Sequence, residues 1–353
     1  MRSPLLDTPG AVAAAVPDDT VAAHYGEPYA EQRALVAGEA MVDRGNREVV
    51  RVSGPDRLGW LNDLSSQKLD TLAPGTPTQT LLLDPQGRLE HHLTLVDDGE
   101  SVWAHVEPGT SAALVAFLEK MRFMRQVEIT DVTSAYAVVT VVSPGSDEQV
   151  PRVVPEGAIA IGGDLLVPRE RLGGLPQELG LRTAGLWAYE ALRIEAHLPR
   201  AGFDTDHKTI PHEVGWIGSA VHLTKGCYRG QETVARVHNL GHPPRRLVFL
   251  HLDGGADTLP PHGAPVTLGV GSPREADPEA AMEGSAEPGQ VGFVGSSARH
   301  HELGPIALAV VKRTVPVDIG LLAGGVAAGQ EVIVPPDAGR NVTIDPGLRR
   351  RIR

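Results

Sequence analysis

The side chain best suited to chemistry in this sequence is a single thiol in a short charged segment. Residues 225–232 read KGCYRGQE, and Cys227 is the only cysteine among the 353 residues. Lys225 and Arg229 would favour the thiolate, which is the reactive form of cysteine. The glycines of the segment permit backbone conformations that would hold the thiol at the tip of a turn. Because free cysteine is also often buried as a small apolar residue, the spacing leaves both a reactive and a structural thiol open.

Basic residues gather around this cysteine although the protein is acidic, with a formal net charge of −12. They are Lys225, Arg229, Arg236, His238, His242, Arg245 and Arg246. Such a cluster could neutralise a ligand that carries carboxylates or phosphates, while any one member could equally belong to a solvated face. The negative net charge argues against general attraction to nucleic acid or anionic membranes, so an anion site is expected to be local.

Complete metal and nucleophile motifs are absent from the sequence. The adjacent pairs His91-His92 and His300-His301 would point to opposite faces of a strand, which makes joint chelation difficult. There is no HExxH, GxSxG, P-loop or GxGxxG pattern. A lone cysteine cannot hold an iron–sulfur cluster, which needs about four ligands, and it cannot form an intrachain disulfide. We therefore expect an intracellular protein without a cluster of its own.

Two helices, a hairpin and a barrel are predicted to position these residues. Apolar residues recur at helical spacing after Ser111, and again between Thr183 and Leu198. Glu195 lies at the border of the second stripe, which consists of Trp187, Ala191, Ile194 and Leu198. The turn DPQGR between LLL and LEHHLTLV predicts a hairpin. Short strands after Pro244 predict a small antiparallel barrel or sandwich.

The length and the composition bound the rest of the organisation. A chain of 353 residues exceeds the roughly 250–300 at which single cores stop growing, so two or three domains are expected. Residues 1–20 have no apolar period, are a poor signal peptide and are expected to form a disordered lead-in. No stretch approaches the roughly 20 apolar residues of a membrane span. We expect a cytoplasmic protein that binds neither membranes nor, directly, nucleic acid.

Two stretches resemble a known family. LRIEAHLPRAGFDTDHKTIPHE and KGCYRGQETVARVHNLGHPPRRL are similar to the signature of the YgfZ-type folate-binding proteins, relatives of the glycine-cleavage T-protein, an aminomethyltransferase. The resemblance implies an α+β, three-lobed T-protein-like fold with a central folate cavity. It implies a folate-binding lobe of residues 21–48 and 134–242, an inserted α+β lobe of 49–133, and a C-terminal antiparallel β-barrel of 243–353 with an acidic flexible loop at 270–289.

The resemblance also assigns roles to residues. Glu195 stands where the family's glutamate meets the pterin ring of tetrahydrofolate, and Cys227 stands at the family's functional thiol. We expect the rest of the folate site to include Lys225, Tyr228, Arg229, Gln231 and Arg236. The sequence departs from the family at His197, where a glycine is usual. It departs again after the hairpin, where Glu90 or His91 replaces the T-protein's catalytic aspartate.

Three hypotheses about function remain open at this stage. The resemblance implies a tetrahydrofolate-binding accessory protein for iron–sulfur cluster assembly or repair, with effects on iron–sulfur enzymes including those that modify tRNA. Iron–sulfur proteins or assembly factors would be its partners, and Cys227 its redox or transfer thiol. The alternative is a tetrahydrofolate-dependent aminomethyl or methyl transferase with Glu90 or His91 as general base. The third is a folate-binding scaffold in which Cys227 is merely buried.

Overall fold

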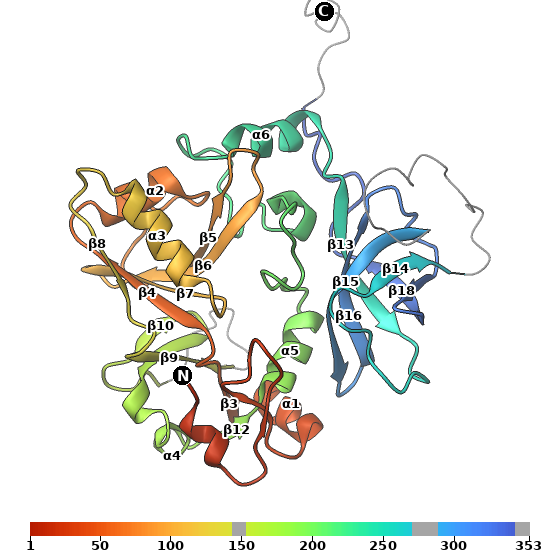
Figure 1. The fold of residues 1–353 in the computed structure, drawn as a ribbon, viewed down its shortest axis with the longest axis horizontal. Helices are drawn as coiled ribbons and strands as arrows, with labels where there is room; N and C mark the ends of the chain where they lie inside the picture. Colours follow the sequence, from red (N-terminus) through yellow and green to blue (C-terminus); the bar gives the residue numbers. More distant parts are fainter. Residues whose placement is uncertain (143–152, 270–288, 343–353) are drawn as a thin grey trace, which may run out of the picture.

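The computed structural model describes residues 1–142, 153–269 and 289–342, and its larger sheets form separate lobes (Figure 1). Two sheets of five strands are covered by helices, and the third is a closed barrel. The predicted α+β fold with a C-terminal antiparallel barrel is confirmed. In the part of the chain that the structure describes, no helix has the length and apolar character needed to cross a membrane.

The inserted lobe is built on an antiparallel sheet with the strand order β5-β6-β7-β4-β8. These strands are β4 (Glu48–Ser53), β5 (Thr78–Leu83), β6 (Leu89–Asp97), β7 (Ser101–Val106) and β8 (Glu128–Asp131). Two helices pack on it, α2 (Arg57–Leu64) and α3 (Ser111–Met121). The predicted start of α3 at Ser111 is confirmed, and Leu114 and Leu118 of its apolar stripe are fully buried.

The second α+β lobe contains a sheet with the order β10-β11-β9-β3-β12. Its strands are β3 (Ala40–Asp43), β9 (Tyr136–Val141), β10 (Ile159–Ile161), β11 (Asp164–Pro168) and β12 (Arg182–Ala184). Around it lie α1 (Pro28–Val36), α4 (Leu175–Leu179), α5 (Leu186–Glu195) and the short 3-10 helix η2 (Arg169–Arg171). The chain leaves this sheet after β3 and returns to it at β9, so the strands of the inserted lobe lie between two strands of one sheet.

The helix predicted from Thr183 to Leu198 is shorter than expected. Residues 182–184 instead form β12, which pairs in parallel with β3, so α5 begins at Leu186. The helix ends at Glu195 because His197 takes the left-handed conformation, with φ at 57°. That conformation favours glycine, the residue that the resemblance leads us to expect at this position. Trp187 and Leu198, predicted to be buried, are 54% and 52% exposed.

The prediction of a disordered lead-in over residues 1–20 is wrong. Pro4–Asp7 form a 3-10 helix, η1, and β1 (Val12–Ala13) pairs with β2 (Ala22–His24). Ser3 is buried, and its backbone N–H donates to the carbonyl of Thr20. The segment is held by hydrogen bonds and by a buried ion pair of Asp18 rather than by an apolar stripe. Composition and periodicity therefore give no signal for it.

The C-terminal lobe is a barrel closed in the order β13-β16-β15-β14-β17-β18. Its strands are β13 (Arg245–Leu252), β14 (Pro265–Leu268), β15 (Gln290–His300), β16 (Gly304–Lys312), β17 (Leu321–Ala323) and β18 (Val326–Val332). Alternate residues of β13 face opposite sides: Val248 and Leu250 fill the barrel, while Leu247 and Phe249 join the core shared with the other lobes. The predicted flexible loop at 270–289 lies outside the described residues except for Gly289.

Candidate functional site

The segment around Cys227, residues 225–230, is an irregular connection that ends in a turn at Arg229 and Gly230, and we call it the cysteine turn. It lies between the short 3-10 helix η3 (Pro211–Val214) and α6 (Gln231–Leu240) in the chain, and the hairpin of β5 and β6 reaches α6 (Figure 1). Cys227 itself is exposed and forms no disulfide. The thiol is therefore accessible, and the interpretation of Cys227 as a buried core residue is wrong.

The C-terminal end of the cysteine turn is pressed against the β5–β6 hairpin. Gly230 has φ at +84°, and a Cβ atom added there would lie 2.6 Å from the carbonyl oxygen of Asp84 and 2.9 Å from Cα of Gly87. Gly87, in the hairpin turn, has φ at +77° and an added Cβ would lie 2.9 Å from Cβ of Thr233. Two glycines thus let the hairpin and the start of α6 approach more closely than other residues allow.

The other end of the turn is anchored by Lys225, which is only 8% exposed. Its Nζ donates to the carbonyl oxygens of Asn62, Ser65 and Gln67, at and just beyond the C-terminal end of α2. Burial lowers the pKa of Lys225 to about 8, whereas its three carbonyl acceptors favour the protonated ammonium. Because the ammonium has three donors, all of them are used. The structure therefore gives Lys225 an anchoring role where we expected contact with folate.

The remaining predicted residues of KGCYRGQE divide between core and surface. Tyr228 is buried in the core that joins the lobes, and burial raises its pKa to about 12. Arg229 Nη1 donates to Glu90 Oε2 at 2.8 Å, so the hairpin also contacts the turn through an ion pair. Gln231 Nε2 donates to the carbonyl of Lys225 at 3.4 Å. Arg236 pairs with Glu232 on an exposed face of α6.

Glu195 lies apart from this turn, at the last residue of α5. Its Oε2 is 3.2 Å from Nε2 of the buried His300, without hydrogen-bond geometry. His300 Nδ1 accepts from the backbone N–H groups of Glu302 and Leu303, so the proton of the neutral ring is on Nε2 and faces the carboxylate. The side chain of Glu195 is 44% exposed. A carboxylate positioned on one oxygen and open on the other can accept hydrogen bonds from a ligand.

The hairpin histidines occupy different surroundings from Glu90. His92 Nε2 is 2.9 Å from Gln79 Oε1, and the ring stacks on Trp216 with centroids 4.7 Å apart. Burial, with Arg47 nearby, lowers the pKa of His92 to about 3, and burial also lowers the pKa of His91. Both rings are therefore neutral at physiological pH. His92 is the hairpin histidine that meets another lobe, at Trp216, and the sequence indicates this histidine only as half of an adjacent pair.

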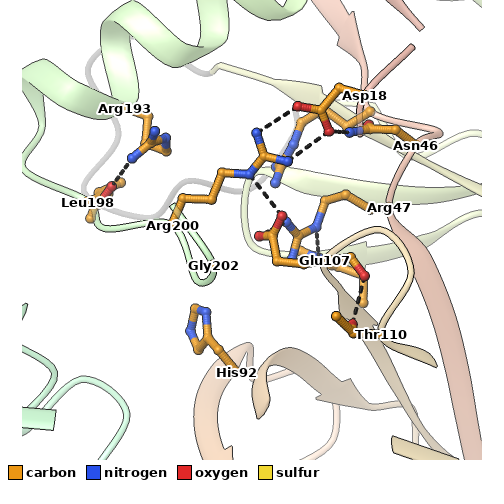
Figure 2. Close-up of polar contacts among 12 residues, drawn as sticks. Asp18, Asn46, Arg47, His92, Glu107, Thr110, Arg193, Leu198, Arg200 and Gly202 are labelled. Carbon is orange, nitrogen blue, oxygen red and sulfur yellow. Dashed lines mark hydrogen bonds and ion pairs between the residues drawn. The ribbon is translucent and has the colours of Figure 1, made fainter. Parts of the chain in front are cut away.

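A buried ionic network joins the lobes at the other end of the molecule, and sequence reasoning missed it. Arg200 Nη1 and Nη2 donate to the two oxygens of Asp18, and Nε donates to Glu107 Oε2, each at 2.8 Å (Figure 2). Arg47 donates to the other oxygen of Glu107, and its Nε donates to His105 Nδ1 at 2.7 Å. The N-terminal segment, the inserted lobe and the loop after α5 meet in this network.

The network continues toward the barrel and is electrostatically complete. Arg193 contacts Glu190, Asp204 and the hydroxyl of Ser296 on β15. Burial alone would raise the pKa of Glu107, but Arg47 and Arg200 lower it well below its ordinary value of 4.5. Every charge in this group thus has a partner, which is the condition for stable burial. The network holds the lobes together.

The comparisons with known proteins agree with this architecture. A crystal structure of the glycine cleavage system aminomethyltransferase T from Bartonella henselae superposes with a TM-score of 0.74, covering 96% of this chain and 98% of that chain at 18% sequence identity. The chain has the T-protein fold. The family model of the GCVT N-terminal domain matches residues 11–160, which include the inserted lobe. The three-lobed T-protein-like fold implied by the resemblance is therefore confirmed.

Sequence relatives include an iron–sulfur cluster assembly factor and aminomethyltransferases. The iron-sulfur cluster assembly factor IBA57 homolog of Mycosarcoma maydis is 28% identical over 232 residues, which are 58% of this chain and 55% of that protein. The aminomethyltransferase of Synechococcus sp. strain WH7803 is 26% identical over 277 residues, which are 67% of this chain and 74% of that enzyme. The chain thus spans just over half the length of the assembly factor.

The structure brings together some of the predicted site residues and separates others. Cys227, Lys225, Arg229, Gln231 and Glu90 gather where the cysteine turn meets the hairpin. Glu195 is on α5 beside His300. Among these residues, no group of three or more His, Cys, Asp or Glu side chains could hold a metal ion.

Proposed function

We propose that this protein is a tetrahydrofolate-binding accessory protein for iron–sulfur cluster assembly or repair in which Cys227 acts as the functional thiol. The observation that carries the proposal is the exposure of the sole cysteine on a turn fixed at both ends. A thiol kept only for packing would be buried. Similarity to an iron–sulfur cluster assembly factor and to aminomethyltransferases supports the same proposal.

A single thiol limits the chemistry that the protein performs. Cys227 would lose its proton and donate one thiolate ligand to iron, while the other ligands of the cluster belong to a partner protein. The cluster is then cargo rather than a resident group. Because the turn is fixed by Lys225 and Gly230, the thiol would be presented to the partner in one orientation. Exposure on the surface lets a partner reach it.

Glu195 is the group proposed to receive the pterin ring. Its two carboxylate oxygens can accept parallel hydrogen bonds from the N3–H and 2-amino groups of a pterin. His300 Nε2 lies 3.2 Å from Oε2 without hydrogen-bond geometry, so both oxygens of Glu195 would be available to the pterin. When bound, tetrahydrofolate supplies nitrogen atoms that carry one-carbon groups. The chain's own contribution is to hold the pterin edge at α5.

The alternative, a one-carbon transferase, receives less support from the hairpin. General base catalysis works best when the pKa of the base is near the operating pH. Glu90 is paired with Arg229, and burial lowers the pKa of His91 below its ordinary value of 6.5. These residues therefore do not form a ready general base. The accessory function needs no such base and rests on the thiol alone.

Cys227→Ser is expected to abolish function without unfolding the protein. In cells from which the gene has been deleted, the wild-type chain should restore the activity of a [4Fe–4S] enzyme such as aconitase, and C227S should restore about a tenth of it or less. Thr224→Ser, a conservative change at an exposed neighbouring residue, is the matched control and should act like wild type. Equal thermal stability of C227S and wild type excludes loss of folding. Full restoration by C227S would refute the role of the thiol.

A further inference from the structure

A cavity of about 520 Å³ lies between the N-terminal segment, α1, α5 and the barrel. Its walls include Val16, Tyr29, Trp187, Phe203 and Leu259. No residue of the cysteine turn lines it, nor does Glu195, so it is separate from the site of the proposed function. Its volume falls within the roughly 300–1,000 Å³ typical of small-molecule sites. The N-terminal segment, far in sequence from α5, forms one of the walls.

The mouth of this cavity exposes large apolar side chains at one place. Val16 is 81% exposed, Trp187 is 54% exposed and Tyr29 is 45% exposed. Single exposed apolar residues are ordinary, but a group around a cavity indicates a binding surface. The Trp187 ring lies against His24, with centroids 4.9 Å apart. His24 thus supports the Trp187 indole, which stays largely exposed although burial of so large an apolar group would stabilise the fold.

Polar groups on the walls already have partners within the protein. Arg200 is bound by Asp18 and Glu107, and Arg193 binds Glu190. The amide of Gln32 donates to the carbonyl of Arg299 and accepts from the N–H of His301. Arg299 Nη2 donates to the carbonyl oxygens of Ala256 and Asp257. The wall carboxylates are paired, so a cationic ligand would meet no free carboxylate and burying it would cost free energy. The walls therefore disfavour a cationic ligand.

His262, on the cavity wall, can accept a hydrogen bond from a ligand. His262 Nδ1 is 3.0 Å from the carbonyl oxygen of Gly295, which fixes Nδ1 as the donor, so Nε2 of the ring is an acceptor. The same ring lies 5.3 Å from that of Phe203. The expected ligand therefore has ring faces that contact the aromatic walls and a hydrogen-bond donor that meets His262 Nε2.

We propose that this cavity binds a planar, largely apolar molecule of two or three rings that carries no positive charge. Trp187 and Phe203 would contact its faces, and His262 Nε2 would accept one hydrogen bond from it. Such a site is independent of the thiol and of folate. Its aromatic walls would contribute through apolar burial and ring contacts.

N-phenyl-1-naphthylamine, a neutral two-ring amine with one N–H group, is a direct probe. Its fluorescence, excited directly, is expected to rise when it binds to the full chain. The titration should saturate at one molecule per chain and give a dissociation constant in the micromolar range. Two cavity variants should each weaken binding about tenfold or more. Ala15→Trp fills the cavity from an exposed wall residue, and Trp187→Ala removes an exposed wall side chain. Phe123→Ala is the control, because Phe123 is 82% exposed and lies in the inserted lobe.

Each outcome of this titration decides the proposal. Weakening by both cavity variants, with F123A equal to wild type and all variants folded by circular dichroism, supports it. Absence of saturable binding, or equal affinity in A15W and wild type, overturns it. Displacement of the probe by tetrahydrofolate would show that the cavity is the folate site, which overturns the assignment of a separate ligand.

Discussion

Glu107→Gln is expected to lower the free energy of unfolding by about 3–5 kcal/mol, the loss usual when one partner of a buried ion pair is removed. The Glu107 carboxylate lies between Arg47 and Arg200, and its side chain is 12% exposed. A glutamine is nearly the same size but neutral, so both guanidinium groups would lose a buried counter-charge. Urea unfolding followed by tryptophan fluorescence measures the effect, and Glu232→Gln, in an exposed pair with Arg236, is the control that should leave stability almost unchanged.

The loss of stability in E107Q is also expected to depend on pH. Because the pKa of Glu107 in the folded protein is below its ordinary value of 4.5, the unfolded chain takes up this proton first on acidification. The stabilisation is therefore fully present above about pH 5.5 and declines as pH falls below 4.5 toward the folded pKa. The difference in the free energy of unfolding between wild type and E107Q should therefore become smaller as the pH falls through that range. A difference of less than about 1 kcal/mol at pH 7 would contradict the role of the network.

Gly230→Ala is expected to cost about 2–4 kcal/mol and to detach the cysteine turn from the hairpin. The added methyl would lie 2.6 Å from the Asp84 carbonyl oxygen and 2.9 Å from Gly87 Cα, both backbone atoms that cannot rotate away. The left-handed φ of +84° adds strain for any residue with a Cβ. The same unfolding experiment measures the loss, and the restoration of aconitase activity measures its effect on function.

Gly226→Ala is the matched control for this variant. Gly226 also belongs to the cysteine turn and directly precedes Cys227, but an added Cβ would meet no atom within 4 Å. The control should keep both stability and function. If G230A were as stable as G226A, the close packing of hairpin and turn would not be the device that fixes Cys227.

Local patterns predicted the parts of the fold that depend on local physics. The start of α3 at Ser111 was predictable because an apolar stripe with i, i+3 and i+4 spacing follows it. The hairpin before Leu89 was predictable because its turn residues stand between two apolar runs. The barrel was predictable from its short alternating strands, although the alternation could not show that both faces of β13 are buried.

Contacts between distant residues were not predictable in this way. Arg200 meets Asp18 across 182 residues of sequence and Glu107 across 93, so neither pairing leaves a local pattern. Lys225 was predicted to be part of a ligand site. Its actual partners are backbone carbonyls, which carry no signal in the sequence, so its anchoring role could not be predicted. The exposure of Trp187 was missed for a related reason, since an apolar stripe does not show which of its members face a cavity.

The rate at which native Cys227 is alkylated, with and without tetrahydrofolate, tests the central claim most directly. We predict that the exposed thiol reacts in the native protein at a rate within about tenfold of the urea-unfolded chain. Saturating tetrahydrofolate should slow the alkylation of wild-type Cys227 several-fold. In Glu195→Gln the alkylation rate should be the same with and without tetrahydrofolate. No reaction before unfolding, or a native rate that tetrahydrofolate does not change, would contradict a functional thiol that works together with bound folate.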